Sequence, residues 1–178
     1  EIFINYYKNQ QIIIFKNKME AERIRKIKSK DGQIFEVDEK CLEMSKVLKG
    51  LAEDFQNLED ELPTNEVDGK NLAKIIDYLK QHKDEPPKEI PKPLPSADLK
   101  PLLSKWDYDF IMPLSLEECV ELVNAANFLD INELVNLASA RLAYEMINCP
   151  IEEAREKFGI KPDMTEEEMK EIDKYPLD

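Results

Sequence analysis

The chain has 178 residues, of which 42% are hydrophobic, and a formal net charge of −13. This length can bury one core of ordinary size, with room for a helical appendage. The negative charge would repel the phosphates of a nucleic acid, so we expect no nucleic-acid partner; it suits a basic protein partner or simply aids solubility. The longest apolar run near the N-terminus, residues 12–15, is too short to cross a membrane, and we expect no membrane partner.

Few side chains of this sequence are suited to metal binding or redox chemistry. The cysteines Cys41, Cys119 and Cys149 are far apart, and with a single histidine they form no zinc-ligand set of the usual spacing. We therefore expect no metal and no cofactor, and predict free, buried thiols in a reducing compartment. Apolar neighbours place Cys119 on the buried side of a helix. The polar surroundings of His82 predict a solvated side chain near a helix C-terminus.

No motif of the sequence points to an enzyme. The four glycines are scattered, so there is no Gly-rich loop to hold phosphates. Carboxylate pairs such as Glu152 with Glu156 are expected on solvated faces when 35% of the residues are charged, and nothing selects one pair as acid and base. We assign no catalytic residue and expect no small-molecule substrate. A small acidic enzyme is the weakest of the alternatives that we keep.

Residues 1–18 differ in composition from the rest of the chain. They begin without methionine and are rich in Ile, Asn, Lys, Phe and Tyr. Met19 opens a different composition, so our hypothesis is that it is the true start and that residues 1–18 are read-through or a weakly ordered extension. The alternative is a genuine N-terminal strand, because these residue types have high β-propensity.

A hairpin opens the main part of the chain. Asp31-Gly32 is a tight-turn signal, because glycine accepts positive φ, and it separates a strand around Ile27 from a return strand at residues 34–37. A further short strand is predicted at residues 64–67.

Two helices follow from apolar residues at helical spacing. The first is predicted to be capped by Ser45 and the second by Asn71. Strands followed by small helices that cover one side of them are typical of an α+β fold.

Residues 83–105 form a proline-rich segment, which we interpret as a loop. Its prolines lack an N–H group and hold the chain extended. A ligand for an SH3 or WW domain is the alternative, although Pro-x-x-Pro patterns often occur by chance.

The last third of the chain, residues 115–174, is predicted to form four short amphipathic helices. Capping-box patterns begin at Ser115, Asp130 and Thr165, each followed three residues later by Glu. Pro150 fits the first turn of a helix, and Gly159 fits the left-handed position just after a helix end. Short helices with apolar residues left over are typical of binding modules.

Several separated motifs resemble the S-phase kinase-associated adaptor family, whose members join F-box proteins to a cullin in SCF ubiquitin ligases. The strongest is residues 124–131 (Asn-Ala-Ala-Asn-Phe-Leu-Asp-Ile). The others, in the same order as in the family, are residues 31–38, 81–87, 106–110, 150–155 and 158–168. Together they cover roughly residues 24–174.

The resemblance implies a BTB/POZ fold with additional C-terminal helices. It divides the chain into an N-terminal part of that domain at residues 19–82, the loop at 83–105, a C-terminal part at 106–148 and F-box-binding helices at 149–178. The implied function is that of an adaptor subunit of an SCF-type cullin ubiquitin ligase, in the cytoplasm and nucleus. A paralogue that binds F-box proteins outside a ligase is one alternative, and an elongin-C-like adaptor is another, which the helices after Pro150 argue against.

The resemblance also implies the binding residues. Asn127 and Phe128 match positions that face the cullin. Five apolar residues match positions that contact F-box helices: Val135, Leu142, Met146, Phe158 and Ile160. For all of these, burial in the protein's own core is the alternative that the sequence leaves open.

The sequence departs from the family pattern in its last residues. The family's aromatic tail is missing, so either the sequence is truncated, or Tyr175 and Leu177 substitute for the tail, or F-box binding is weaker. Cys149 replaces the expected hydroxyl cap before Pro150, at a cost of about 0.5–2 kcal/mol. Glu166 stands where some members carry a hydroxylated proline, so we expect no such modification.

Overall fold

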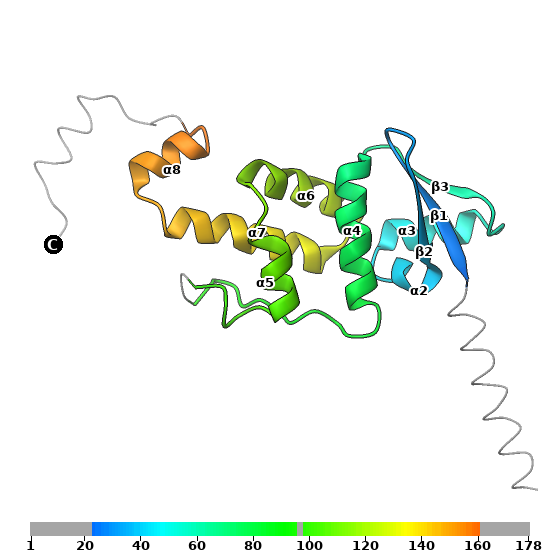
Figure 1. Ribbon diagram of the computed structural model, residues 1–178, viewed down its shortest axis with the longest axis horizontal. Helices are drawn as coiled ribbons and strands as arrows, with labels where there is room; N and C mark the ends of the chain where they lie inside the picture. The colour runs from blue at the N-terminus through cyan, green and yellow to red at the C-terminus, as the bar shows by residue number, and fades with distance from the viewer. Residues whose placement is uncertain (1–22, 96–97, 161–178) are drawn as a thin grey trace, which may run out of the picture.

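The computed structural model describes residues 23–95 and 98–160. In these ranges a small sheet is followed and covered by helices, so the α+β prediction is confirmed (Figure 1). Several predictions lie outside the described residues: the cap at Thr165, the substitution of Tyr175 and Leu177 for the aromatic tail, the hypothesis on residues 1–18, and the absence of hydroxylation at Glu166.

The sheet has three strands in the order β2-β1-β3. Strand β1 (Ile24–Ser29) lies in the centre, antiparallel to β2 (Ile34–Asp38) and parallel to β3 (Glu61–Thr64). The predicted turn is confirmed, because Gly32 has φ +82° and the Ser29 amide donates to the Gln33 carbonyl at 2.9 Å.

Strand β3 lies earlier in the chain than predicted. It was expected at residues 64–67, but Val67 is in a turn in which its amide donates to the Thr64 carbonyl at 3.1 Å. Leu62 and Thr64 alternate inward from β3 and are fully buried. Pro63 is tolerated because β3 is an edge strand, where a missing N–H group breaks no ladder bond.

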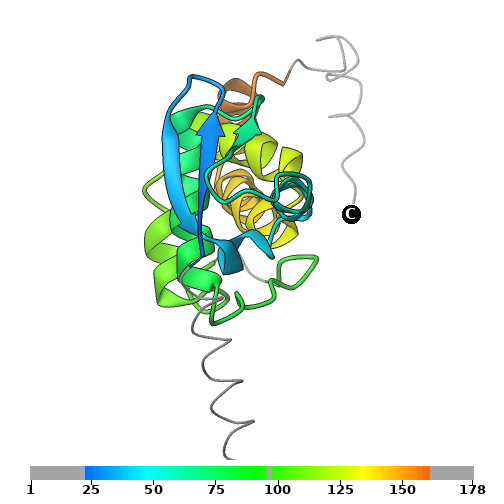
Figure 2. The ribbon, with the colours of Figure 1, turned by 90° about the vertical axis from the view of Figure 1, so that its right-hand side faces the viewer.

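Two short helices, α2 (Glu39–Leu42) and α3 (Lys46–Asp54), follow the hairpin and lie on the helical side of the sheet (Figure 2). The cap predicted for α3 is confirmed, because the Ser45 hydroxyl accepts from the Leu48 amide at 3.1 Å. The same hydroxyl donates to the Leu129 carbonyl and so joins α3 to the far half of the chain. Arg25 of β1 is fully buried and donates to the Phe55 carbonyl at the end of α3.

Helix α4 (Gly69–His82) stands between the sheet layer and the helices α5 to α7 (Figure 1). It begins earlier than predicted: the cap is Asp68, whose carboxylate accepts from the Asn71 amide at 2.8 Å. Asn71, predicted as the cap, is therefore the third helical residue. The prediction failed because Asp68 already supplies the oxygen that the helix start needs, and Asn71 is 3% exposed and turned inward.

Helix α6 (Leu116–Phe128) confirms its predicted capping box. The Ser115 hydroxyl accepts from the Glu118 amide at 3.2 Å, and the Glu118 carboxylate accepts from the Ser115 amide at 3.1 Å. Lys70 and Lys74 of α4 also contact this carboxylate, at 3.1 and 3.2 Å. The Ser115 amide and the two ammonium groups lower the pKa of Glu118 to about 2.

Helix α7 (Asn132–Ile147) does not have the cap predicted at Asp130. Its N-cap is Ile131, which makes no side-chain capping bond. Asp130 has φ +52°, and its carboxylate instead pairs with Lys46 at 2.8 Å and accepts from the Asn132 side chain at 3.0 Å. The reason lies in the tertiary structure. The turn between α6 and α7 packs on the start of α3, where Lys46 forms an ion pair with the Asp130 carboxylate.

The proline-rich segment is held against the rest of the protein. Leu99 is 1% exposed, and Ile90 and Leu94 pack on the core. Lys92 donates to the Asn136 side chain of α7 at 2.6 Å. These contacts favour the loop interpretation over that of a free ligand for another domain.

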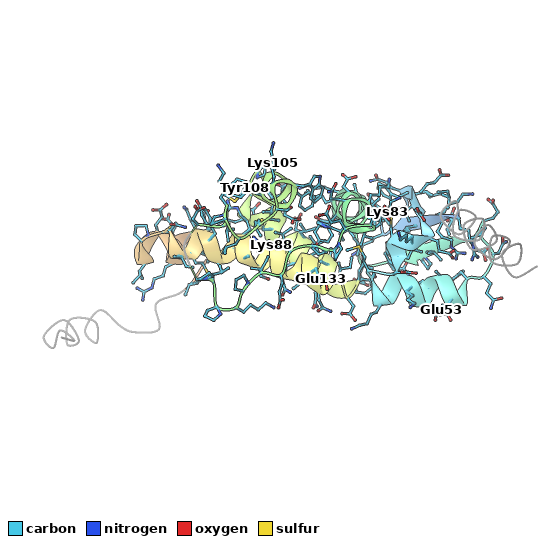
Figure 3. All side chains as sticks on the ribbon, turned by 90° about the horizontal axis from the view of Figure 1, so that it is seen from below. Glu53, Lys83, Lys88, Lys105, Tyr108 and Glu133 are labelled. Carbon is cyan, nitrogen blue, oxygen red and sulfur yellow. The ribbon has the colours of Figure 1, made fainter. Side chains whose placement is uncertain are left out.

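The loop leads into α5 (Lys105–Ile111), where the prediction for His82 is wrong. His82 is 7% exposed; its Nε2 lies 2.9 Å from Asp107 Oδ1, and its Nδ1 lies 3.1 Å from the Glu85 carbonyl oxygen. The two ring nitrogens thus each lie within hydrogen-bond distance of an oxygen atom, and the ring is held between α5 and the start of the loop. Asp107 is 3% exposed, whereas Lys105 on the same helix points to solvent (Figure 3).

The described residues also bear on the predictions about thiols, metal binding and membrane spans. Cys41 and Cys119 are buried and free, as predicted, whereas Cys149 is only partly buried. Within residues 23–95 and 98–160, no group of three or more His, Cys, Asp or Glu side chains could hold a metal ion. None of the helices in the same ranges is both long and apolar enough to cross a membrane.

We expect His82→Ala to lower the free energy of unfolding by about 1–3 kcal/mol, because it leaves the buried Oδ1 atom of Asp107 without its hydrogen-bond partner. Denaturant unfolding followed by circular dichroism measures this loss. Gln81→Ala, at the exposed neighbouring position, is the control and should stay within about 0.5 kcal/mol of the wild type. Equal stability of the two variants would show that the pair does not hold α4 to α5.

Candidate functional site

Large exposed apolar side chains gather at two places on the helices. Val120, at 45% exposure, and Phe128, at 42%, lie on α6. Four others lie at the end of α7, on α8 (Ile151–Lys157) and just after it: Met146, Ile147, Ile151 and Ile160. We call these the α6 surface (Val120, Asn124, Asn127 and Phe128) and the α7–α8 surface (these four residues with Phe158).

The α6 surface contains the pair predicted to face a cullin. Asn127 and Phe128 are both exposed at the C-terminal end of α6. Asn124 and Val120 lie about one and two turns earlier, on the same face of the helix as Phe128, because successive members of this series are four residues apart. Sequence reasoning missed these two, although this spacing from Phe128 was the available signal.

The opposite face of α6 explains why the pair is exposed. Cys119, Leu122 and Ala126 are fully buried in the core. An α-helix that buries one stripe leaves the other side to solvent, so Phe128 lies outside the core rather than in it. An exposed aromatic ring beside an amide is a common composition of binding hot spots.

The five residues predicted to bind an F-box protein are placed in three different ways. Val135 and Leu142 on α7 are half-buried and pack against the core. Met146 and Ile160 are each 47% exposed. Phe158 is half-buried at the end of α8.

These five residues do not form one compact patch. Val135, Leu142 and Met146 share a face of α7, because spacings of seven and four residues return to the same side of a helix. Phe158 and Ile160 belong to the separate end of α8. Sequence reasoning missed Ile147 and Ile151, which are 55% and 67% exposed. They could have been found from their position, because they flank the break between two predicted helices.

The end of α8 is built as the sequence predicts. Gly159 has φ +63°, the Ile160 amide donates to the Arg155 carbonyl at 2.9 Å, and the Gly159 amide donates to the Glu156 carbonyl at 3.3 Å. These two bonds are a Schellman motif, which satisfies the last carbonyl groups of the helix.

The start of α8 differs by one residue from the prediction. Pro150 is the N-cap rather than the first helical residue, and no side chain caps this helix end. Cys149 therefore lies one position before the cap. The shift arises because Pro150 has extended geometry, with ψ 149°, and the helix starts only at Ile151.

A charged cluster joins α8 to α7. Glu145 accepts from Arg141 at 2.9 Å and pairs with Lys157 at 3.2 Å, and Lys157 also pairs with Glu153 at 2.8 Å. The Arg141 guanidinium and then the Lys157 ammonium hold the pKa of Glu145 below its usual value. The position of α8 thus depends partly on a surface ion pair, which is a weak restraint.

The buried cluster around His82 is not arranged for catalysis. Ser104 donates to Asp107 at 2.7 Å rather than to His82, and both imidazole nitrogens already have oxygen partners. No ring nitrogen is left to take a proton from a nucleophile. The α6 surface and the α7–α8 surface are therefore the stronger candidate sites among the described residues.

The fold and these surfaces define a BTB/POZ protein with C-terminal helices. A family model described as Skp1 family, tetramerisation domain, matches residues 24–84, and one described as Skp1 family, dimerisation domain, matches residues 132–175. The chain belongs to the Skp1 family.

Named relatives cover most of the chain. An S-phase kinase-associated protein 1 homolog of Tetrahymena thermophila is 38% identical over 83% of this chain and 88% of its own length. SKP1-like protein 1A of Arabidopsis thaliana is 34% identical over 86% of this chain and 94% of its own length. The E3 ubiquitin ligase complex SCF subunit sconC of Arthroderma otae is 30% identical over 81% of this chain and 87% of its own length.

We expect acidification to loosen α8 before α6 or α7. The lowered pKa of Glu145 means that its ion pairs stabilise α8 fully above the ordinary carboxyl pKa of 4.5 and progressively less as the pH falls through the lowered value. Hydrogen exchange of α8 amides, corrected for the intrinsic pH dependence, should show this loss of protection.

Glu145→Gln should show the weaker protection already at neutral pH, with a smaller change on acidification. Glu133→Gln, at an exposed position of α7, is the control. If α8 keeps the same protection in Glu145→Gln as in the control, the ion pair does not restrain α8.

Proposed function

We propose that this protein is the adaptor subunit of an SCF-type cullin ubiquitin ligase, which holds an F-box substrate receptor and a cullin at the same time. The observation that carries the proposal is the presence of two separate exposed apolar surfaces on a Skp1-family fold. They lie toward opposite ends of α7, whose 16 residues span roughly 24 Å. The relative from Arthroderma otae is named as a subunit of an SCF complex.

The mechanism needs no catalytic group on this chain. An adaptor that binds two proteins at once raises the concentration of one near the other, so a receptor-bound substrate stays close to the ubiquitin-transfer machinery on the cullin. The chain itself acts as a non-catalytic bridge. It works in the cytoplasm and nucleus.

The cullin contacts Asn127 and Phe128. The exposed ring of Phe128 offers apolar area at a fixed position, and the Asn127 amide beside it offers hydrogen bonds. Val120 and Asn124 extend this contact along α6.

The F-box protein contacts the α7–α8 surface. Met146 and Ile160 supply exposed apolar area and Phe158 is half-buried beside them, while the half-buried Val135 and Leu142 extend the contact along α7. The apolar helices of the partner complete the burial that these short helices leave unfinished. The segment at residues 149–178 is thus the F-box-binding part, and residues 19–82 and 106–148 form the BTB/POZ domain.

We expect the double substitution Asn127→Lys with Phe128→Lys to weaken cullin binding by more than about tenfold, because it places two charges in a contact that must lose its water. F-box binding should be unchanged. A pull-down from native extract, scored for cullin and for F-box proteins, measures both.

The matched control is Ile24→Lys with Ile34→Lys, which adds the same charge at two isoleucines on the sheet, 46% and 50% exposed. It should keep both partners. Full cullin binding by a folded Asn127→Lys, Phe128→Lys protein would remove the cullin site from α6.

We expect Met146→Glu with Ile160→Glu to give the reverse result. Carboxylates at these two exposed positions would be buried without partners on F-box binding, so that affinity should fall by more than about tenfold while the cullin stays bound. The same pull-down measures it. Loss of neither partner would contradict the F-box assignment, and wild-type protein that captures F-box proteins but no cullin would favour a paralogue acting outside a ligase.

A further inference from the structure

The surface beside Phe128 is hollowed. A cavity of about 360 Å³ lies between the turn before α4, the first turn of α4 and the second half of α6. The residues around it come from two stretches of the chain: Glu66, Val67, Asp68 and Asn71, and Glu121, Asn124, Ala125 and Phe128.

The polar groups around this hollow are mostly hydrogen-bond acceptors. Glu66, Asp68 and Glu121 contribute carboxylates. The Asn71 side chain donates its Nδ2 to Asp68 at 3.1 Å and to Glu121 at 3.4 Å, which directs the amide nitrogen toward the acids. Two of the three acids thus share one amide donor.

Besides the negative charge, Asn71 gives an independent reason to expect a hydrogen-bond donor in the hollow. It lines the hollow, is 3% exposed, and its Oδ1 has no hydrogen-bond partner in the part of the chain that the structure describes. A buried carbonyl oxygen is costly to leave unpaired, so such an atom in a native protein calls for a donor from elsewhere. The hollow therefore combines negative charge with an unused acceptor.

The complementary ligand is a group that only donates hydrogen bonds and carries positive charge. Lysine and arginine side chains meet both conditions, since neither has an acceptor. Val67, Ala125 and the ring of Phe128 give the hollow an apolar side, against which the alkyl stem of such a side chain packs. A bare metal ion would make no use of that apolar side, and the described acidic groups are not placed to hold one.

The chain's own nearest lysine does not fill this role. Lys70 is not among the residues around the hollow; it pairs closely with Glu118, at 3.1 Å, and only at the longer distance of 4.0 Å with Glu121. Lys74 likewise pairs with Glu118. The closest ion pairs of these two lysines are thus with the first turn of α6, and Glu66 and Asp68 of the hollow have no ion pair with either of them.

We propose that the hollow receives a lysine or arginine side chain of the cullin. The inference rests on the proposed function, because Phe128 belongs both to the α6 surface and to the wall of the hollow. A cullin that covers Phe128 reaches the hollow without a second contact area, and the net charge of −13 favours a basic partner face.

The test is Glu66→Gln with Glu121→Gln, with the affinity for a purified cullin measured by calorimetry at low and high salt. Glutamine keeps the shape and removes two charges, while Asp68 is left in place because it caps α4. We expect about a tenfold loss of affinity at low salt that shrinks as salt rises, since partly exposed charge pairs are screened.

The control is Glu36→Gln with Glu53→Gln, which removes the same charge at exposed sites on β2 and on α3, outside the hollow (Figure 3 shows Glu53). It should change the affinity by less than about twofold. Thermal melting of both variants shows whether they are folded, and the salt dependence of wild-type binding serves as a second measurement should the first variant melt early.

The outcomes separate the two proposals. If the hollow variant binds like its control, or wild-type binding is insensitive to salt, the hollow takes no basic side chain, although Asn127→Lys with Phe128→Lys still abolishes binding. If that substitution also leaves cullin binding intact, the α6 surface is not the cullin site and both proposals fail.

Discussion

Helix α4 is the element on which the rest of the structure depends, because both halves of the chain pack against it. Leu72, Ile75, Ile76 and Leu79 are at most 3% exposed, and Tyr78 is fully buried. A helix that is apolar on more than one side belongs in a core, and here it forms the wall shared by the sheet layer and by α5 to α7 (Figure 1). Its polar ends are used as well: Lys70 and Lys74 hold the start of α6, and His82 holds α5.

This central position also decides which helices keep free surface. Helix α6 buries one stripe against the core, so its other stripe, with Val120 and Phe128, meets solvent. Helix α7 is half-covered along its length, and α8 lies beyond the reach of α4 at the far end of the molecule (Figure 1). Apolar area left open in this way is costly in isolation and becomes favourable when a partner covers it, which is the physical basis of an adaptor.

The two surfaces differ in how firmly they are held. The α6 surface stands on a helix with a complete capping box and fully buried residues beneath it. The α8 end of the other surface is a seven-residue helix without a side-chain cap, joined to α7 through the ion pair between Lys157 and Glu145. Under the proposed assignment, a partner at α6 would dock on a rigid surface, whereas a partner at α8 would have to order a weakly held segment and would lose affinity to that ordering.

The sequence by itself determined the features that depend on a few neighbouring residues. The turn at Gly32, the capping box of α6 and the helix end at Gly159 were all predicted, because each is closed by hydrogen bonds over three to five residues. The family motifs likewise indicated the fold class. Tertiary structure overruled the local signal where a distant residue competed for the same side chain.

Asp130 does not cap α7 because its carboxylate forms an ion pair with Lys46. His82 is not solvated because its ring contacts Asp107, which lies 25 residues away in the sequence. Only the tertiary structure decided that Phe128 is exposed while Val135 and Leu142 are half-buried, since a helical stripe does not say which side the core will cover. The hollow beside Phe128 has no sequence pattern at all. Its two walls are separated by about fifty residues, and they meet because α4 and α6 pack side by side.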